Sequence, residues 1–206
     1  EKPFPFPNGW AFIFLILKSK QYLCNLVSGL ANLAKKHGIA NQSCMNIAVN
    51  TQLLIKDRLE GIGWFTYETL RRITKDHPEH RFFLIFDRHW DPSFVFSDNV
   101  VPIKTYLPSR HPLLWYLRFH CEIPKLLKKH QIDLFVSPDG WNTSTNIPSL
   151  VVMHDLNFMH FPENMPLLTR LYYRHFFPIY AKKACRLATV SHFPQKDIAS
   201  TFGISP

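Results

Sequence analysis

Apolar runs alternate with stretches of helical periodicity from Met45 onward. The runs 134–136, 150–153 and 187–190 are apolar apart from Thr189, as expected for central strands of a parallel sheet, because such strands are buried on both faces. The whole pattern predicts strands near residues 46–51, 81–86, 100–106, 133–137, 149–153 and 186–191. Strands that alternate with helices in this way indicate an α/β fold.

The first predicted helix has one apolar stripe, and a Glu68–Arg72 pair at i,i+4 lies on its outer side. The stripe consists of Ile62, Phe65, Thr66, Thr69, Leu70 and Ile73. A second helical region spans residues 112–130 and should break or restart at Pro124. Its basic side chains are expected opposite its apolar ones, with Arg118, Lys125 and Lys129 facing away from Leu113, Leu117, Ile123 and Leu127.

A third helix is predicted over residues 166–183, and a short helix should follow Ser191 and end at Gly203. The apolar positions at helical spacing in the third helix are Leu168, Leu171, Tyr172, Phe176 and Ile179. Right-handed crossovers then give a Rossmann-like, doubly wound, mainly parallel sheet over residues 45–206. Such domains bind ligands outside the carboxyl ends of their strands, so we expect functional residues in the loops that follow the strands.

Residues 1–44 do not match this pattern. Their apolar run, 10–17, is too short to cross a bilayer, which takes about 20 residues in a helix. We interpret the segment as an extension outside the domain, with a peripheral amphipathic helix over 23–36 as the alternative.

The composition, 46% hydrophobic and 19% charged, excludes a disordered chain. With 24 Lys and Arg against 15 Asp and Glu in 206 residues, the formal charge is +9, which would suit a polyanion, an anionic membrane or a phosphate-bearing substrate. The sequence shows no recognition-helix motif, so we do not expect nucleic-acid binding. The four cysteines are scattered without a C-x-x-C pair, which indicates reduced thiols and a cytoplasmic location.

Gly61-Ile62-Gly63 opens the first predicted helix. Free N–H groups at a helix N-terminus favour an anion such as phosphate, and glycine lets a ligand approach the backbone. The third glycine of G-x-G-x-x-G is absent because position 66 is Thr, and a P-loop is absent as well. For an isolated G-x-G, a plain loop and helix start is therefore the favoured interpretation.

His154 and Asp155 directly follow the predicted strand 149–153. An imidazole at this position can exchange a proton or hydrogen-bond a substrate hydroxyl, and the adjacent acid can orient it; a histidine satisfied by a local turn is equally compatible. A metal site made of His154, Asp155 and His160 lacks ligand spacing, so we expect no metal.

Two further loops could contact a ligand. Pro138-Asp139-Gly140 predicts a turn, and Trp141 after it should be exposed, where it could stack on a sugar or simply pack. Ser191 should cap the last helix and could also reach a ligand hydroxyl. The basic, aromatic-rich region 110–130 could contact an anionic membrane or a phosphate-bearing lipid, although a solvated helix face is the commoner explanation of such a region.

Four phrases carry a family resemblance. They are Asn46-Ile47-Ala48-Val49-Asn50-Thr51; Glu60-Gly61-Ile62-Gly63 followed by Thr66-Tyr67-Glu68-Thr69-Leu70; His154-Asp155-Leu156-Asn157-Phe158 followed by Pro162-Glu163; and Thr189-Val190-Ser191-His192-Phe193 followed by Asp197-Ile198. In order and spacing, residues 45–206 resemble the N-terminal domain of family 4 glycosyltransferases of the GT-B fold.

The resemblance implies a retaining, metal-independent transfer of a sugar from a nucleotide-diphosphate donor to a glycan or lipid-linked acceptor. It places Gly61 and Gly63 at the donor diphosphate and sugar and His154 at the reacting sugar. From their positions next to these residues or at strand ends, we add Ile62 to the donor site, Asp155 to the catalytic pair with His154, and Trp141, Asn157 and Ser191 as acceptor or sugar contacts. No cofactor beyond the nucleotide sugar is implied. A mannosyltransferase-like enzyme of cell-surface polysaccharide assembly, at the cytoplasmic face of a membrane, is the expected type.

In that family a second domain, C-terminal in the same chain, supplies most nucleotide contacts. Its absence from these 206 residues predicts negligible transferase activity for this chain alone. Two other interpretations stay open: a nicotinamide-dependent Rossmann oxidoreductase, and a non-catalytic module that pairs with a separate donor-binding domain.

Overall fold

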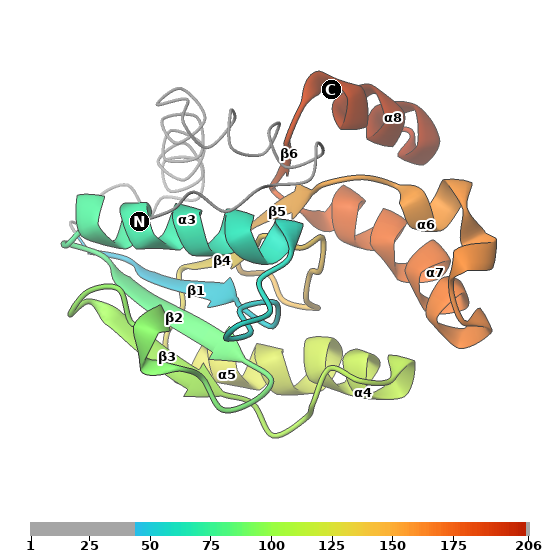
Figure 1. Ribbon diagram of the computed structural model, residues 1–206. Helices are drawn as coiled ribbons and strands as arrows, with labels where there is room; N and C mark the ends of the chain where they lie inside the picture. The colour runs from blue at the N-terminus through green and yellow to red at the C-terminus, as the bar shows by residue number, and fades with distance from the viewer. Residues whose placement is uncertain (1–43, 205–206) are drawn as a thin grey trace.

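The computed structural model describes residues 44–204, and the predicted extension 1–44 lies outside them except for Cys44. Six strands form one sheet in the order β3-β2-β1-β4-β5-β6, and every neighbouring pair is parallel (Figure 1). The strands are β1 (Asn46–Asn50), β2 (Arg81–Phe86), β3 (Val100–Lys104), β4 (Leu134–Ser137), β5 (Ser149–Met153) and β6 (Arg186–Thr189). All six predicted strands and the Rossmann-like class are thus confirmed.

The strand order reverses at β1, which lies between β2 and β4. The chain moves outward from β1 to β3, then returns to start β4 on the other side of β1 and continues to β6. At such a switch point the connections after neighbouring strands run in opposite directions, and a crevice opens at the carboxyl ends. The sheet topology therefore favours a ligand-binding crevice after β1 and β4.

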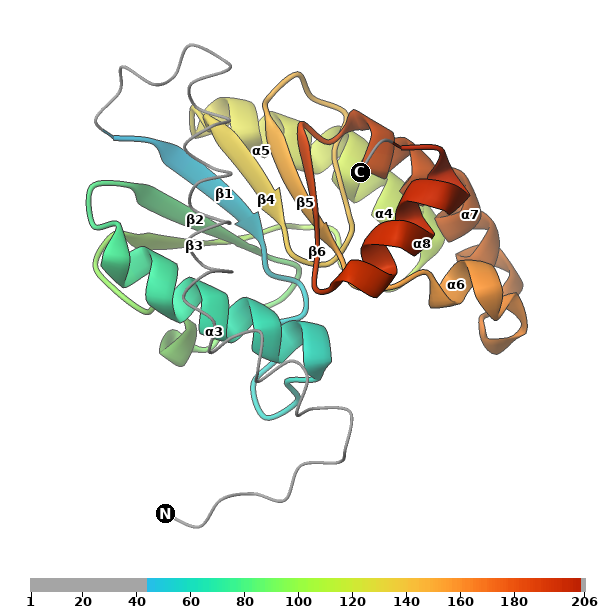
Figure 2. The ribbon, with the colours of Figure 1, turned by 90° about the horizontal axis from the view of Figure 1, so that it is seen from above.

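The helices cover both faces of the sheet (Figures 1 and 2). They are α3 (Gly61–Asp76), α4 (Pro112–Leu117), α5 (Ile123–Lys129), α6 (Asn157–His160), α7 (Leu167–Lys183) and α8 (His192–Phe202), with short 3-10 turns at Pro92–Phe94 and Pro162–Asn164. Helix α3 lies on one face, whereas α4, α5 and α7 lie on the other. No helix within residues 44–204 is both long enough and apolar enough to cross a membrane.

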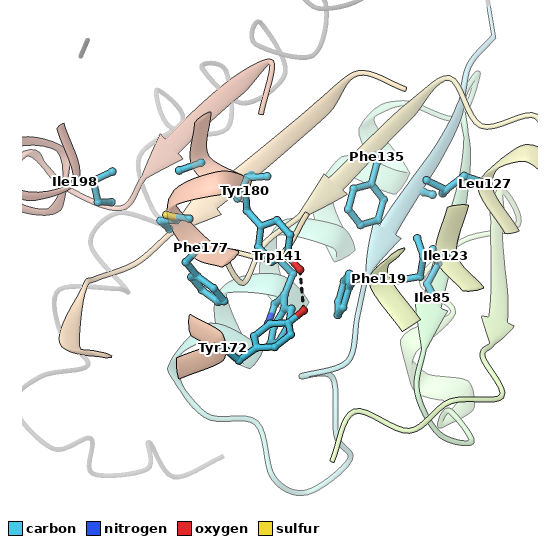
Figure 3. Close-up of a cluster of buried hydrophobic side chains, with 14 of the residues drawn as sticks. Ile85, Phe119, Ile123, Leu127, Phe135, Trp141, Tyr172, Phe177, Tyr180 and Ile198 are labelled. Atoms are coloured by element: carbon cyan, nitrogen blue, oxygen red, sulfur yellow. Dashed lines mark hydrogen bonds between the residues drawn. The ribbon is translucent and has the colours of Figure 1, made fainter. Parts of the chain in front are cut away.

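Alternate residues of each strand enter two separate cores. Ile47 and Val49 of β1 pack with Leu70 and Ile73 of α3, while Ala48 between them belongs to the core under α5 and α7. The second core is rich in aromatic side chains, and Figure 3 shows Trp141, Tyr172, Phe177 and Tyr180 gathered there. Burial on both sides explains why the strands are apolar without alternation.

The stripe of α3 lies where it was predicted, and Arg72 pairs with Glu68 at 2.9 Å. The second helical region does break, through a π-helical turn at Arg118–Glu122 that ends just before Pro124. Its predicted faces are confirmed in α5, where Ile123 and Leu127 are buried and Lys125 and Lys129 are exposed. They are wrong before α5, because Arg118 is fully buried and Leu113 is 61% exposed. On α7 the prediction is also partly wrong, since Leu168 and Leu171 are exposed.

Candidate functional site

A cavity of about 260 Å³ lies at the carboxyl ends of β1, β4 and β5. Four of the predicted site residues line it, namely Ile62, Trp141, His154 and Asp155. Ile62 comes from the first turn of α3, Trp141 from the loop after β4, and the other two from the loop after β5. Folding thus brings together candidates that are up to 93 positions apart in the sequence, as Ile62 and Asp155 show.

The glycine segment forms the first turn of α3. Glu60 is the N-cap residue but provides no side-chain cap, so no side chain at that position takes up the amides of the first turn. A Cβ atom at Gly63 would lie 2.9 Å from the carbonyl oxygen of Leu53, so this glycine lets the preceding loop pack against the helix. The first turn of α3 therefore packs closely against the preceding loop and also places the helix N-terminus beside the cavity.

His154 is held by contacts on two sides. Its Nε2 lies 2.8 Å from the carbonyl oxygen of Pro138, and its ring meets Phe65 of α3 edge-on at 5.0 Å between centroids. A carbonyl oxygen can only accept, so Nε2 carries the proton in this hydrogen bond. In the neutral ring, Nδ1 is then the acceptor available to a ligand in the cavity.

Burial lowers the pKa of His154, while the Pro138 carbonyl and the charge of Asp155 raise it by less. The neutral imidazole is therefore favoured near pH 7. A neutral ring with a fixed tautomer has one nitrogen that can accept a hydrogen bond from a hydroxyl group, whereas a protonated ring has none.

Asp155 does not hold His154 through a hydrogen bond, contrary to the expected orienting role. Its Oδ1 instead accepts from the backbone N–H of Asn157 at 3.0 Å, and the side chain is exposed. Pro138 supplies the orienting contact. The carboxylate at the strand end is used to turn the chain into α6.

Asn157 lies beside a second hollow of about 410 Å³, next to the first. Asp155, Phe158 and Tyr173 line both hollows. The cavity and this hollow therefore form two adjoining compartments, and Asn157 faces only the second of them.

Trp141 is buried rather than exposed, with 4% of its surface accessible. It stacks on Phe119 at 4.6 Å between centroids and meets Phe177 edge-on at 5.4 Å. Gly140 before it has φ +85°, and a Cβ there would lie 2.9 Å from the Phe177 ring. The predicted turn is present, but it directs the indole into the core. The ring therefore forms part of the cavity wall and is not exposed for stacking on a sugar.

Asp139 is a cavity residue that the sequence pattern did not identify. Its buried carboxylate accepts from Asn50 Nδ2 (2.9 Å to each oxygen), Gln52 Nε2 (2.7 Å) and Ser137 Oγ (2.8 Å). Burial raises the pKa of Asp139 and these hydrogen bonds lower it by less. The bonds fix the loop whose Pro138 carbonyl orients His154.

Arg118 reaches the same network from the π-helical turn. Its guanidinium donates to Gln52 Oε1 and Ser109 Oγ at 2.9 Å and to Thr105 Oγ1 at 3.2 Å. Gln52 therefore bridges a buried cation and a buried carboxylate, and burial lowers the pKa of Arg118. One sequence feature could have indicated this buried polar network: the polar stretch Asn50-Thr51-Gln52 at the end of an otherwise apolar strand.

Ser191 is the N-cap residue of α8, as predicted, but its side chain makes no cap hydrogen bond. It lines neither of the two hollows described. His160 pairs with Asp197 of α8 at 2.8 Å rather than with His154. Among residues 44–204, the group of three ligating side chains that approach within 4.8 Å of one another is His77, Glu79 and His80, in the loop before β2 at the amino ends of the strands.

Comparison with known proteins adds one finding. No protein of curated function matches the chain significantly. The sequence model of Glycosyltransferase Family 4 matches residues 59–206, from just before α3 to the last residue, which is well over half of the chain. The matched part contains the first turn of α3, the Asp139 loop and His154. The chain therefore belongs to Glycosyltransferase Family 4 and carries the N-terminal, Rossmann-like domain of that family.

Proposed function

We propose that this domain is the acceptor side of a glycosyltransferase that moves a sugar, with retention, from a nucleotide-diphosphate sugar to a glycan or lipid-linked acceptor. The observation that carries the proposal is the cavity at the switch point, where the first turn of α3 and a neutral His154 meet within the family match. A mannosyl donor and a cytoplasmic location belong to the same proposal.

The first turn of α3 is assigned to the donor diphosphate. The amides of Gly61, Ile62 and Gly63 lie at the positive end of a 16-residue helix, and Ile62 lines the cavity. A second Rossmann-like domain, C-terminal in the family and opposite this edge, supplies the other nucleotide contacts. No metal ion is needed, because the helix N-terminus and that domain neutralise the phosphates.

His154 is assigned to the transferred sugar. Its Nδ1 accepts a hydrogen bond from a sugar hydroxyl, while the Nε2–H bond to Pro138 holds the ring. Asp155 lies at the junction of the two hollows, and Asn157 in the second hollow contacts the acceptor. Trp141 supports the sugar through the part of its ring that lines the cavity, and Ser191 stays a candidate contact near the start of α8.

Thermal-shift titration of the chain with a panel of UDP- and GDP-sugars, and with NAD(H), tests the proposal. We expect stabilisation by at least one nucleotide sugar and none by NAD(H). His154→Ala should weaken that binding about 5- to 10-fold, since a hydrogen bond in a buried site contributes roughly 1–1.4 kcal/mol. His175→Ala, on an exposed histidine of α7, is the matched control and should bind normally.

Stabilisation by NAD(H) alone would favour the oxidoreductase instead. Wild-type nucleotide-sugar affinity in His154→Ala would remove the role of that residue and leave the family assignment intact. In an enzyme with both domains, the same substitution should lower kcat.

A further inference from the structure

The loop 77–80 joins the end of α3 to the start of β2, and three of its side chains can ligate a metal ion. They are His77, Glu79 and His80, and their ligating atoms lie within 4.8 Å of one another. Figure 1 shows this loop at the left of the sheet, away from α6 and α7. The loop lies at the amino ends of the strands, whereas the cavity lies at the carboxyl ends, so the cluster is separate from the candidate site.

The spacing of the donor atoms fits a small tetrahedral ion. Oε1 of Glu79 lies 3.1 Å from Nδ1 of His77 and 3.7 Å from Nε2 of His80. Zinc bonds imidazole nitrogen and carboxylate oxygen at about 2.0–2.2 Å, so its tetrahedral ligands are about 3.3–3.6 Å apart. The two separations lie on either side of that range.

The imidazoles of His77 and His80 are close enough to share an ion. Their rings are nearly parallel, with centroids 5.7 Å apart. Two imidazoles bonded to one ion have centroids about 5–6 Å apart. The rings need only turn about their Cβ–Cγ bonds to direct a lone pair at a common point, and this torsion of histidine is soft.

The backbone of the loop is fixed by a residue outside it. Nδ2 of Asn99 donates to the carbonyl oxygens of His77 (3.0 Å) and His80 (2.9 Å). The same amide also donates to Thr74 of α3 (3.0 Å), and its Oδ1 accepts from Ser97 Oγ at 2.7 Å. The ligands thus project from a backbone that is already in place, which lowers the entropy cost of binding an ion.

His80 has a hydrogen-bonding capacity that residues 44–204 leave unused. Its Nδ1 is buried without a partner, and the 3.7 Å from its Nε2 to Glu79 is too long for a hydrogen bond. A buried polar group without a partner calls for an explanation, and a bound ion is one. The ion pair of His77 with Glu79 alone does not supply it, whereas an ion bonded to the His80 ring does.

The ligand set selects the kind of ion. Calcium and magnesium prefer oxygen ligands, whereas imidazole suits zinc and its neighbours among the transition metals. Two histidines and one glutamate leave the fourth position of a tetrahedral zinc ion to water. A cation is also favoured at this place because His77 is the C-cap residue of α3, where the helix dipole is negative.

We propose that His77, Glu79 and His80 bind one Zn²⁺ ion, with water as the fourth ligand, and that the ion ties the end of α3 to the start of β2. The ion stabilises the fold and takes no part in sugar transfer. The expectation of no metal concerned the reaction at the cavity, and this site lies apart from it. The proposal does not depend on the proposed function.

Titration of the complete 206-residue chain, free of any histidine tag, with Co²⁺ and then Zn²⁺ tests the proposal. Co²⁺ takes the same ligands and absorbs visible light strongly in a tetrahedral site. We expect one Co²⁺ ion per chain with that absorption, and its displacement by Zn²⁺. The midpoint of thermal unfolding should rise by about 5 °C at a Zn²⁺ concentration about 100 times Kd.

His77→Ala and His80→Ala should each lower the affinity for Zn²⁺ at least about 10-fold, because losing a residue that only orients a ligand already costs that much. Glu79→Gln keeps the shape of the side chain and should also weaken binding. His175→Ala, on the exposed histidine of α7, is the matched control and should bind as the wild type does. The ligands are partly exposed, so circular dichroism should show all variants folded.

Three results would overturn the proposal. The first is the absence of binding at one ion per chain. The second is a weak, octahedral Co²⁺ spectrum, which indicates an ion held largely by water. The third is a Zn²⁺ affinity that neither His77→Ala nor His80→Ala changes, which would place the ion on other histidines of the chain.

EDTA treatment separates this site from the cavity. It should abolish the stabilisation by Zn²⁺ and leave the affinity for a nucleotide sugar unchanged. An affinity that falls with EDTA and recovers with Zn²⁺ would place the ion at the cavity and contradict a separate site. A chain that binds Zn²⁺ through His77 and His80 but binds no nucleotide sugar keeps the metal site and contradicts the proposed function.

Discussion

Helices α3 and α7 flank the same cavity but differ in which kinds of side chain they bury and which they expose. Helix α3 buries one stripe against the sheet and carries Glu68 with Arg71 and Arg72 on its outer side. Helix α7 buries aromatic side chains such as Phe177 and Tyr180 and exposes leucines. Ile62 of α3 and Phe177 of α7 both line the cavity.

The difference teaches how far a periodic pattern can be trusted. For α3 the apolar stripe packs against the sheet, and only its first residue, Ile62, lines the cavity, so sequence and structure agree. For α7 apolar residues serve both a core and a surface, and a pattern that counts only apolar positions cannot separate the two uses. Aromatic side chains fill the wide space under α7, which leaves the leucines at the surface.

The largest expected effect distinguishes the two uses within α7. Phe177→Ala removes a ring that contacts Gly140, Trp141 and Phe158, so the free energy of unfolding should fall by about 3–5 kcal/mol. Leu171→Ala, six positions earlier on the exposed side, should change it by less than about 0.5 kcal/mol. Urea unfolding followed by circular dichroism measures both; similar losses would mean that the leucines belong to the core.

An intermediate effect concerns His154 between the two helices. Its pKa is lowered in the folded protein, so the unfolded chain binds more protons as pH falls below 6.5. Stability is fully present above pH 6.5 and is lost as pH decreases from 6.5 toward the lowered pKa, by about 1.4 kcal/mol for each unit of difference. Unfolding curves of the wild type between pH 7.5 and 5.5 should show this loss.

His154→Gln should flatten that part of the pH profile without removing it, because burial also lowers the pKa values of His80 and His120. An unchanged slope in His154→Gln would mean that the pKa of His154 is the same in the folded and unfolded states.

The smallest effect tests the outer side of α3. Glu68→Ala removes ion pairs with Arg71 and Arg72, and surface pairs of this kind contribute about 0.3–0.5 kcal/mol each. The midpoint of unfolding should therefore shift only slightly, and less at 0.5 M salt than at 0.05 M. A loss as large as that of Phe177→Ala would show that α3 depends on its surface charges.

Strand positions were predictable because burial on both faces leaves a continuous apolar run, which local sequence displays directly. The network around Asp139 was not predictable, because Asn50 and Gln52 are 89 and 87 residues away from it. Local sequence gave Pro138-Asp139-Gly140 as a turn, and the turn is present. Whether its carboxylate faces water or a buried amide depends on long-range packing.

Arg118 and Trp141 were misplaced for the same reason. Periodicity assigns a charged residue to the outer face, yet Thr105, Ser109 and Gln52 together offer enough acceptors to bury the guanidinium. The site was predicted best where it follows a rule of topology, as with His154 at a strand end, and worst where several distant polar groups must meet.

The pairing of β1 with β4 has a consequence for the nascent chain. Ile47 of β1 meets Leu134 of β4, so one long edge of β1 gains its neighbour only after the ribosome has made almost 90 further residues. The half-sheet β3-β2-β1 can assemble before then, with an open and apolar edge. During that interval of synthesis the open edge of β1 can mispair, and slower translation between β3 and β4 would prolong the interval.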